Sequence, residues 1–135
     1  MTSPEESNCN VGGELEIIFL FCFVTENQEL GTIFMDRIAM LTEILTANPD
    51  DTFARYGLAV EYSNSEQTDK ALDEFKTLVG KNPDYTPAYF MAAQTLAKAA
   101  RVDEAKRMLV DGISSARRTG NTHAQSEMTA MLEEL

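Results

Sequence analysis

The side chains that could do chemistry are few, and their spacing does not assemble a catalytic centre. The chain has one histidine, His123, with no second histidine and no paired cysteine near it in the sequence. A nucleophile needs a neighbouring base, and a metal site needs several His, Cys or carboxylate ligands at ligand spacing. The acidic pairs Asp73-Glu74 and Asp103-Glu104 fall on predicted helices, where such pairs ordinarily face water. We therefore predict a protein that is not an enzyme and that holds no metal and no cofactor.

The charge of the chain disfavours phosphate-bearing partners. There are 22 acidic and 11 basic residues, a net charge of -11 at pH 7, and a pI near 4.4. Nucleic acids and anionic membranes are bound through clustered lysine and arginine. A nucleotide-binding loop would need a glycine-rich turn before a helix, and Gly12-Gly13 stands alone and precedes none. We predict no nucleic-acid partner and no membrane partner.

Residues 1–34 differ from the rest of the chain. They carry six glutamates and neither lysine nor arginine, and the first basic residue is Arg37. Their apolar run, Ile17 to Val24, is far shorter than the roughly 20 residues of a bilayer span. No export signal is visible, and the two cysteines, Cys9 and Cys22, are too few for a secreted disulfide framework. We predict free thiols and a cytoplasmic location.

The apolar run has no helical period, so it fits a buried strand or an all-round apolar helix equally well. Two interpretations of residues 1–34 remain open. In one, the segment covers the first helix of the domain that follows. In the other, Met35 is the natural start, and residues 1–34 lie outside the functional unit, which is residues 35–135.

An internal repeat organises the rest of the chain. The turn Asn48-Pro49-Asp50 aligns with Asn82-Pro83-Asp84 at a shift of about 34 residues, a length typical of stacked helix pairs. Small and large apolar positions align at the same shift, namely Ala59 with Ala93, Ala71 with Ala105, and Leu41 with Phe75 and Leu109. We call this alignment the repeat register.

Each unit is predicted to be two helices. In the unit 52–85, the first helix begins near Thr52, with Asp51 or Thr52 as its cap. The polar stretch from Ser63 to Gln67 ends this helix. Thr68 caps a second helix, which is ended by the stretch from Gly80 to Pro83 because proline cannot continue a helix. The unit 86–119 repeats this pattern, with Pro87 in the first turn, where its missing N–H costs nothing.

The pattern resembles the tetratricopeptide repeat family. The matching residues are Leu58-Ala59-x-x-Tyr62, Ala71-x-x-x-Phe75 and Pro83, then Tyr89-x-x-Ala92-Ala93-x-x-Leu96 and Ala105-x-x-x-Leu109. The resemblance implies an all-α fold, an α-solenoid of antiparallel helix pairs. It would contain a half repeat (35–51), two full repeats (52–85 and 86–119) and a capping helix (121–135). The small residues would let the two helices of a repeat approach closely, so that larger side chains there would overpack the contact.

The sequence departs from the family pattern at four positions. Arg55 stands where the family has tryptophan or a large apolar residue. Glu66 and Ala100 stand where glycine commonly bends the turn between the two helices. Arg117 replaces the closing proline of the second repeat. We expect these departures to weaken single contacts without changing the spacing.

Residues 121–135 are predicted to form a helix that closes the stack. An apolar stripe faces one side, while Gln125, Glu127, Glu133 and Glu134 face out; the stripe consists of Ala124, Met128, Met131, Leu132 and Leu135. Gly120 is predicted to end the preceding helix. His123 lies at the start of the last helix and is predicted to be a surface residue.

A candidate binding face lies opposite the buried stripe of each first helix. Phe53, Tyr56 and Val60 form it in the first repeat, and Phe90 and Gln94 occupy the matching positions in the second. By resemblance, these five residues line a concave groove that binds a peptide or helix. Because they carry no cation, the carboxylate clamp of some family members is not expected.

The sequence is compatible with two functions that belong to different classes. The favoured one is an interaction module, adaptor or chaperone-like, that binds an apolar peptide or helix of a protein partner in the groove. The alternative is a self-associating scaffold, because two complete repeats are few for stability and a homo-oligomer would complete the core.

Overall fold

A computed structural model describes residues 36–135, and every regular element in this range is an α-helix. A first helix covers residues 36–47. It is followed by α2 (Thr52–Asn64), α3 (Thr68–Lys81), α4 (Thr86–Lys98), α5 (Val102–Thr119) and α6 (Thr122–Glu134). The predicted all-α class is confirmed, whereas the predictions for residues 1–34 lie outside the described residues.

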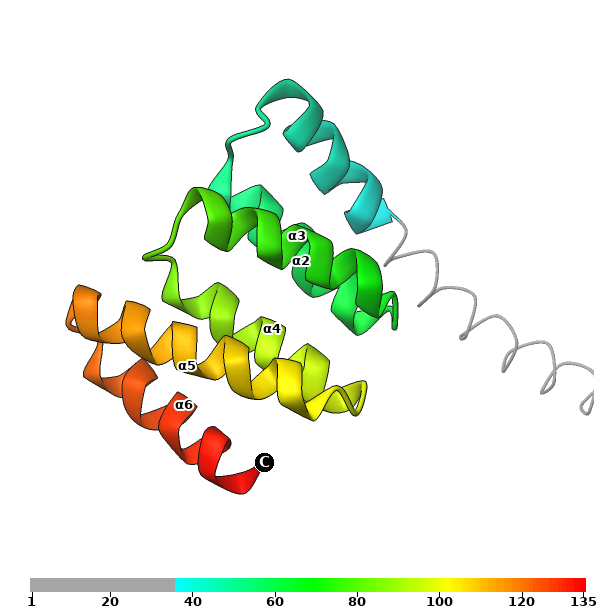
Figure 1. Cartoon of the computed structure of the whole chain (residues 1–135). Coiled ribbons are helices and arrows are strands. Elements are labelled where there is room, and N and C mark those ends of the chain that lie inside the picture. The colour runs from blue at the N-terminus through cyan, green and yellow to red at the C-terminus, as the bar shows by residue number, and fades with distance from the viewer. Residues whose placement is uncertain (1–35) are drawn as a thin grey trace, which may run out of the picture. The chain divides into compact units, whose positions relative to one another are not determined.

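The helices stack in chain order and alternate in direction (Figure 1). α2 packs on α3, α3 on α4, α4 on α5, and α5 on α6. We call α2 and α4 the A helices and α3 and α5 the B helices. Because α2 and α4 also touch, the first repeat meets the second through both its helices. This is the predicted solenoid of antiparallel helix pairs.

The small residues predicted at the helix contacts are fully buried. Ala59, Ala71, Ala93 and Ala105 each have 0% of their surface exposed. Ala59 and Ala71 lie in one apolar cluster with Phe75. Their complete burial agrees with the prediction that small side chains let large neighbours fill the core while the helix axes stay close.

The helix ends follow the local sequence, with one exception. The Asp51 carboxylate accepts a hydrogen bond from Ala54 N at 2.8 Å, so that Asp51 is the N-cap of α2. Gly120 ends α5 in the left-handed region, with φ at 70°. The prediction that Thr68 caps α3 is wrong, because Gln67 is the N-cap and makes no capping bond with its side chain. Thr68 is instead the first residue inside the helix.

The turns within the two repeats bend at non-glycine residues. Glu66 (φ 61°) and Ala100 (φ 58°) are the only non-glycine residues between 36 and 135 with positive φ. These are the two positions where the family pattern expects glycine. The left-handed conformation costs an L residue about 1–2 kcal/mol, so each turn stores local strain.

We expect Glu66→Gly and Ala100→Gly each to raise the free energy of unfolding by roughly 0.5–1 kcal/mol. The relief of left-handed strain exceeds the extra entropy that glycine loses on folding. Urea unfolding followed by circular dichroism measures the change. Gly120→Ala is the matched control of opposite sign, since Gly120 also has positive φ and open space around it. Destabilisation by Ala100→Gly would show that its methyl group contributes more than the strain costs.

Arg55 is not a weakened contact. Its guanidinium Nη1 lies 2.6 Å from Glu74 Oε2 on α3, and its Nη2 donates to Pro49 O at 2.8 Å. The exposed fractions of the two charged side chains are 14% and 25%. Arg55 thus ties α2 to its own B helix and to the preceding turn, which corrects the expectation drawn from the family pattern.

The last helix, α6, is turned relative to the A helices. Met128 aligns with Gln94 in the repeat register, yet Met128 is 0% exposed and Gln94 is half-buried. His123 aligns with the buried Tyr89, yet the His123 side chain is 84% exposed. Because of this rotation, α6 buries its apolar stripe against α5 and faces solvent with polar side chains, as a terminal cap requires.

Large and small side chains exchange places between the α3–α4 contact and the α5–α6 contact. Leu78 on α3 is buried beside Ala88 and Ala92 of α4. At the matching position α5 has Gly112, and the space is filled from the other side by Met128 of α6. The glycine is therefore required by the close approach of a neighbouring side chain.

Candidate peptide-binding face

The predicted face on α2 divides into one free and two packed side chains. Phe53, Tyr56 and Val60 follow one another at helical spacing. Phe53 is 79% exposed, the highest value among the large apolar residues of the described chain. Tyr56 and Val60 are half-buried and rest on the apolar cluster around Phe75. Of the three, Phe53 alone presents most of its surface to solvent.

The Tyr56 ring contacts two other aromatic rings edge to face. Its centroid lies 6.3 Å from that of Phe75, with an interplanar angle of 63°, and 5.5 Å from that of Tyr85, with an angle of 67°. Such T-shaped pairs add stability beyond area burial. Tyr56 is thus part of the packing between α2, α3 and the turn before α4, as well as part of the predicted face.

On α4 the predicted residues are also half-buried. Phe90 packs against the cluster that contains Tyr89, Leu109 and Met128. Gln94 is half-buried one turn further along. The two A helices are also linked by a hydroxyl pair, Ser63 Oγ and Thr95 Oγ1, at 2.8 Å. We call Phe53, Tyr56, Val60, Phe90 and Gln94 the A-helix face.

Aligning the two repeats did not identify Tyr85, whose ring lies beside that of Tyr56. In the repeat register Tyr85 aligns with Asp51, so that the repeat gave no apolar signal at this position. Burial raises the pKa of both tyrosines, with the second ring adding to the effect at Tyr56. Both hydroxyls, like any ordinary phenol, are protonated at neutral pH and can donate hydrogen bonds.

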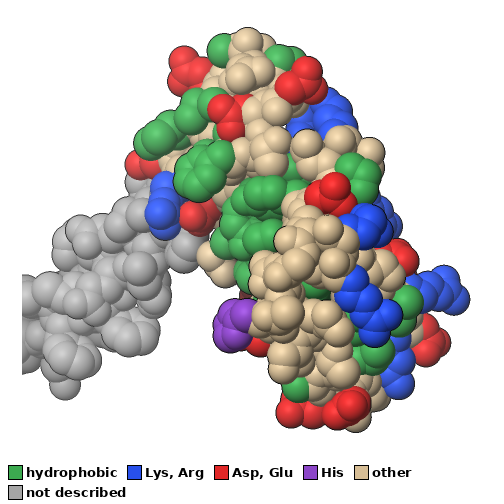
Figure 2. Space-filling model, turned by 90° about the vertical axis from the view of Figure 1, so that its left-hand side faces the viewer, with side chains coloured by type: hydrophobic (Ala, Val, Ile, Leu, Met, Phe, Trp, Pro, Cys, Tyr) green, Lys and Arg blue, Asp and Glu red, His purple; other side chains and the backbone are tan. Residues whose placement is uncertain are grey.

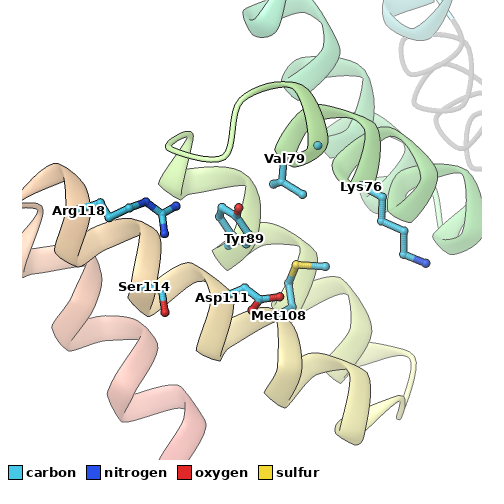
Figure 3. Close-up of a pocket in the computed structure, with 8 residues that line it drawn as sticks. Lys76, Val79, Tyr89, Met108, Asp111, Ser114 and Arg118 are labelled. Atoms are coloured by element: carbon cyan, nitrogen blue, oxygen red, sulfur yellow. The ribbon is translucent and has the colours of Figure 1, made fainter.

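A cleft of about 320 Å³ on the opposite side of the repeats was also not predicted. It lies between α3 and α5, with Tyr89 of α4 at its base (Figure 3). The Tyr89 hydroxyl donates to Pro83 O at 3.0 Å, and Arg118 Nη2 donates to the same oxygen at 3.1 Å. Its lining mixes charge and apolar surface and consists of Lys76, Val79, Gly80, Tyr89, Met108, Asp111, Ser114 and Arg118.

Most basic side chains lie on the B helices, together with six acidic ones. Figure 2 shows hydrophobic side chains gathered over the upper half of the face in view. Most of the visible lysine and arginine side chains lie along its right-hand border. The B helices carry seven of the basic residues, namely Lys70, Lys76, Lys81, Lys106, Arg107, Arg117 and Arg118. The A-helix face carries no charged side chain, which suits an apolar ligand and does not suit a carboxylate clamp.

The described part of the chain contains neither a cluster of metal-ligating side chains nor a membrane-spanning helix. Between residues 36 and 135, no three His, Cys, Asp or Glu side chains gather as metal ligands would. No helix in that range is both long and apolar enough to cross a bilayer. His123 is a surface residue, as predicted, 3.5 Å from Glu127.

These features define a class of protein, an α-solenoid of helix pairs with an apolar face on its A helices. A family model described as tetratricopeptide repeat matches residues 62–125. A solved tetratricopeptide repeat domain protein from Salinibacter ruber is 31% identical, with 64% of this chain and 88% of that chain covered and a TM-score of 0.61. The chain belongs to the tetratricopeptide repeat family, whose members are typically protein-interaction modules without enzymatic activity.

Two further similarities are found, one to a protein sequence and one to a solved structure. A TPR repeat-containing protein of Pseudomonas aeruginosa is 23% identical over 95 residues, which is 70% of this chain and 90% of that protein. The crystal structure of PcrH in complex with the chaperone binding region of PopD is similar with a TM-score of 0.70 at 17% identity, covering 91% of each chain. At this identity the second likeness concerns the fold alone.

Proposed function

We propose that this chain is an adaptor or chaperone-like protein that binds an apolar peptide or helix of a protein partner on its A-helix face. The single observation that carries the proposal is Phe53, a phenylalanine that leaves 79% of its surface in solvent on the same side of α2 as Tyr56. Aromatic side chains of this kind are enriched among the residues that dominate binding energy.

Two further points support an apolar ligand. The five residues of the face carry no charge, so that apolar side chains can be buried on them without desolvating an ion. The similar structure of PcrH holds the chaperone binding region of another protein, PopD. A peptide held in the same manner by this chain would contact Phe53 and Phe90 with its apolar residues.

The test compares two exposed apolar residues on opposite sides of the stack. We expect Phe53→Ala to abolish capture of the partner from native lysate, while the melting temperature changes little, because most of the Phe53 ring is already in solvent. Val110→Ala is the matched control, since Val110 is 52% exposed on a B helix. We expect its bait to retain the partner.

Phe90→Ala gives the second arm of this test. Because Phe90 packs against the core, this change should weaken binding and also lower stability by about 1–3 kcal/mol. Retention of the same partner by the Phe53→Ala and Phe90→Ala baits would contradict the proposal and move the binding surface elsewhere.

The alternative, a self-associating scaffold, is favoured by exposed apolar residues at the amino-terminal end of the stack. Met40 is 59% exposed and Ile44 is 40% exposed. Sedimentation equilibrium separates the two functions, since a scaffold would show a concentration-dependent mass and a melting temperature that rises with protein concentration. A monomer at all concentrations would remove the alternative.

A further inference from the structure

The cleft on the B-helix side holds a set of side chains that the preceding repeat boundary lacks. It lies between α3 and α5 and measures about 320 Å³. In the repeat register its residues Tyr89 and Met108 match Arg55 and Glu74. Those two residues form an ion pair instead, with Nη1 and Oε2 2.6 Å apart. The stacking of repeats therefore does not require the chemistry of the cleft.

The floor of the cleft is apolar. Tyr89, which is 7% exposed, forms its base, and the half-buried Val79 and Met108 flank it from α3 and α5 (Figure 3). Val79 and Met108 also pack on the apolar clusters of the core, which anchors both walls. The cleft is at the lower limit of small-molecule sites, which measure roughly 300–1,000 Å³. It therefore suits one large apolar side chain rather than a helix.

Arg118 closes one end of the cleft. Its Nε donates to Asp84 Oδ1 at 3.0 Å and its Nη2 donates to Pro83 O at 3.1 Å, so that the guanidinium links α5 to the turn before α4. Figure 3 shows this group directed along the cleft toward Tyr89. Within the described chain, its Nη1 takes part in no hydrogen bond or ion pair. A guanidinium that is held in place with a donor nitrogen to spare is suited to bind a carboxylate.

Asp111 brings a charge of the opposite sign to the same cleft. It is exposed and lies two helical turns before Arg118 on α5, about 10 Å along the axis. Its carboxylate has neither an ion pair nor a hydrogen bond among residues 36–135. Lys76, at the other end, directs its ammonium away from the cleft (Figure 3). Together with Asp84 these charges sum to zero, which matches a ligand with one charge of each sign.

We propose that this cleft binds a free α-amino acid with a large apolar side chain. The ligand carboxylate accepts a hydrogen bond from Arg118 Nη1, and the α-ammonium donates to the Asp111 carboxylate. The ligand side chain rests on Tyr89, between Val79 and Met108. Both charged contacts thus use groups of the cleft that have no other partner in the described chain. The site is separate from the A-helix face and does not depend on the function proposed for that face.

The experiment titrates the full chain with L-phenylalanine and follows the amide signals by two-dimensional NMR. N-acetyl-L-phenylalanine lacks the ammonium group, and L-phenylalaninamide lacks the carboxylate. We expect each derivative to bind about tenfold more weakly or worse, the loss expected for a hydrogen bond between charged groups. Glycine, which has both charges and no side chain, should shift no signal at the same concentration. The shifted amides should belong to residues around the cleft, among them Val79, Met108 and Ser114.

Three outcomes would overturn the proposal. Equal affinities of the three compounds, or no shift with any of them, would show that the charges of the cleft do not select the ligand. A derivative that binds as tightly as L-phenylalanine would assign the cleft to a chain end of a polypeptide. This would be the carboxy-terminal residue for the acetyl compound and the amino-terminal residue for the amide. Shifts confined to other parts of the chain would place binding elsewhere.

Paired variants identify the two charged contacts. Arg118→Gln should reduce the preference for L-phenylalanine over its amide, whereas the exposed neighbour Arg117→Gln should keep it. Asp111→Asn should reduce the preference over the acetyl compound, whereas Asp103→Asn, also exposed on α5, should keep it. Preferences that are the same in all four variants would overturn the assignment of these contacts.

Gly80→Leu tests the location by filling the cleft. Gly80 lines the cleft, and a Cβ atom at this position meets nothing within 4 Å. Leucine is also a better helix former than glycine, so the melting temperature should not fall. We expect the variant to lose L-phenylalanine binding, and its full retention would contradict the proposed site. Phe53→Ala should leave binding unchanged, which separates this test from that of the A-helix face.

Discussion

Gly112→Ala is expected to lower the melting temperature by roughly 10 °C. A Cβ atom at this position would lie 2.6 Å from Met128 Sδ and 2.7 Å from Tyr89 Cβ. Met128 can rotate away, but Tyr89 Cβ is fixed to the backbone of α4, so the helices must move apart. Overpacking costs about 1–3 kcal/mol and exceeds the gain in helix propensity of up to about 1 kcal/mol. In a domain of this size, each kcal/mol shifts the midpoint by about 4–8 °C.

Two other glycines of the stack provide matched controls. A Cβ at Gly80 meets nothing within 4 Å, and one at Gly57 makes ordinary contact with Leu41 at 3.4 Å. Because both lie inside helices, Gly57→Ala and Gly80→Ala should be neutral or stabilising by up to about 1 kcal/mol. Thermal unfolding of the three variants would detect the contrast. A Gly112→Ala protein as stable as Gly80→Ala would mean that α4 and α5 are further apart than described.

Removing one member of the ion pair between α2 and α3 is expected to lower the free energy of unfolding by about 2 kcal/mol or more. Glu74→Ala leaves the Arg55 guanidinium, whose side chain is 14% exposed, with Pro49 O as its remaining acceptor. An unpaired and largely buried charge is strongly unfavourable, more so than the loss of a surface salt bridge. Urea unfolding measures the loss.

The second repeat supplies the rescue experiment. Tyr89 and Met108 stand at the positions that match Arg55 and Glu74, and the Tyr89 hydroxyl donates to Pro83 O as Arg55 donates to Pro49 O. The double variant Arg55→Tyr/Glu74→Met should therefore regain most of the stability that Glu74→Ala loses, because no charge remains buried. A double variant less stable than Glu74→Ala would show that the first repeat cannot accommodate the second repeat's side chains.

The sequence predicts the helix pairs because the repeat carries the information twice. Asn-Pro-Asp turns mark where the first helix and α3 end, and the alanines mark where helices approach, so that one unit checks the other. The orientation of α6 could not be predicted in this manner. Its stripe around Met128 is visible, but the rotation away from the register of Gln94 depends on how Met128 fills the space above Gly112.

The sequence predicts which residues lie on the A-helix face, but it does not predict which of them pack against neighbouring side chains. Helical spacing puts Phe53, Tyr56 and Val60 on one side of α2, and it cannot distinguish a ring in solvent from one against a neighbour. Tyr56 packs inward because Tyr85 comes beside it from the turn before α4. The cleft above Tyr89 could not be predicted either, since its walls come from helices distant in sequence.

The rotation of α6 makes the two ends of the stack chemically different. One end carries exposed apolar side chains, and the other end carries exposed glutamates over a filled core. Pairing two copies through the same end would close a dimer, whereas an open filament would also require the α6 end to bind.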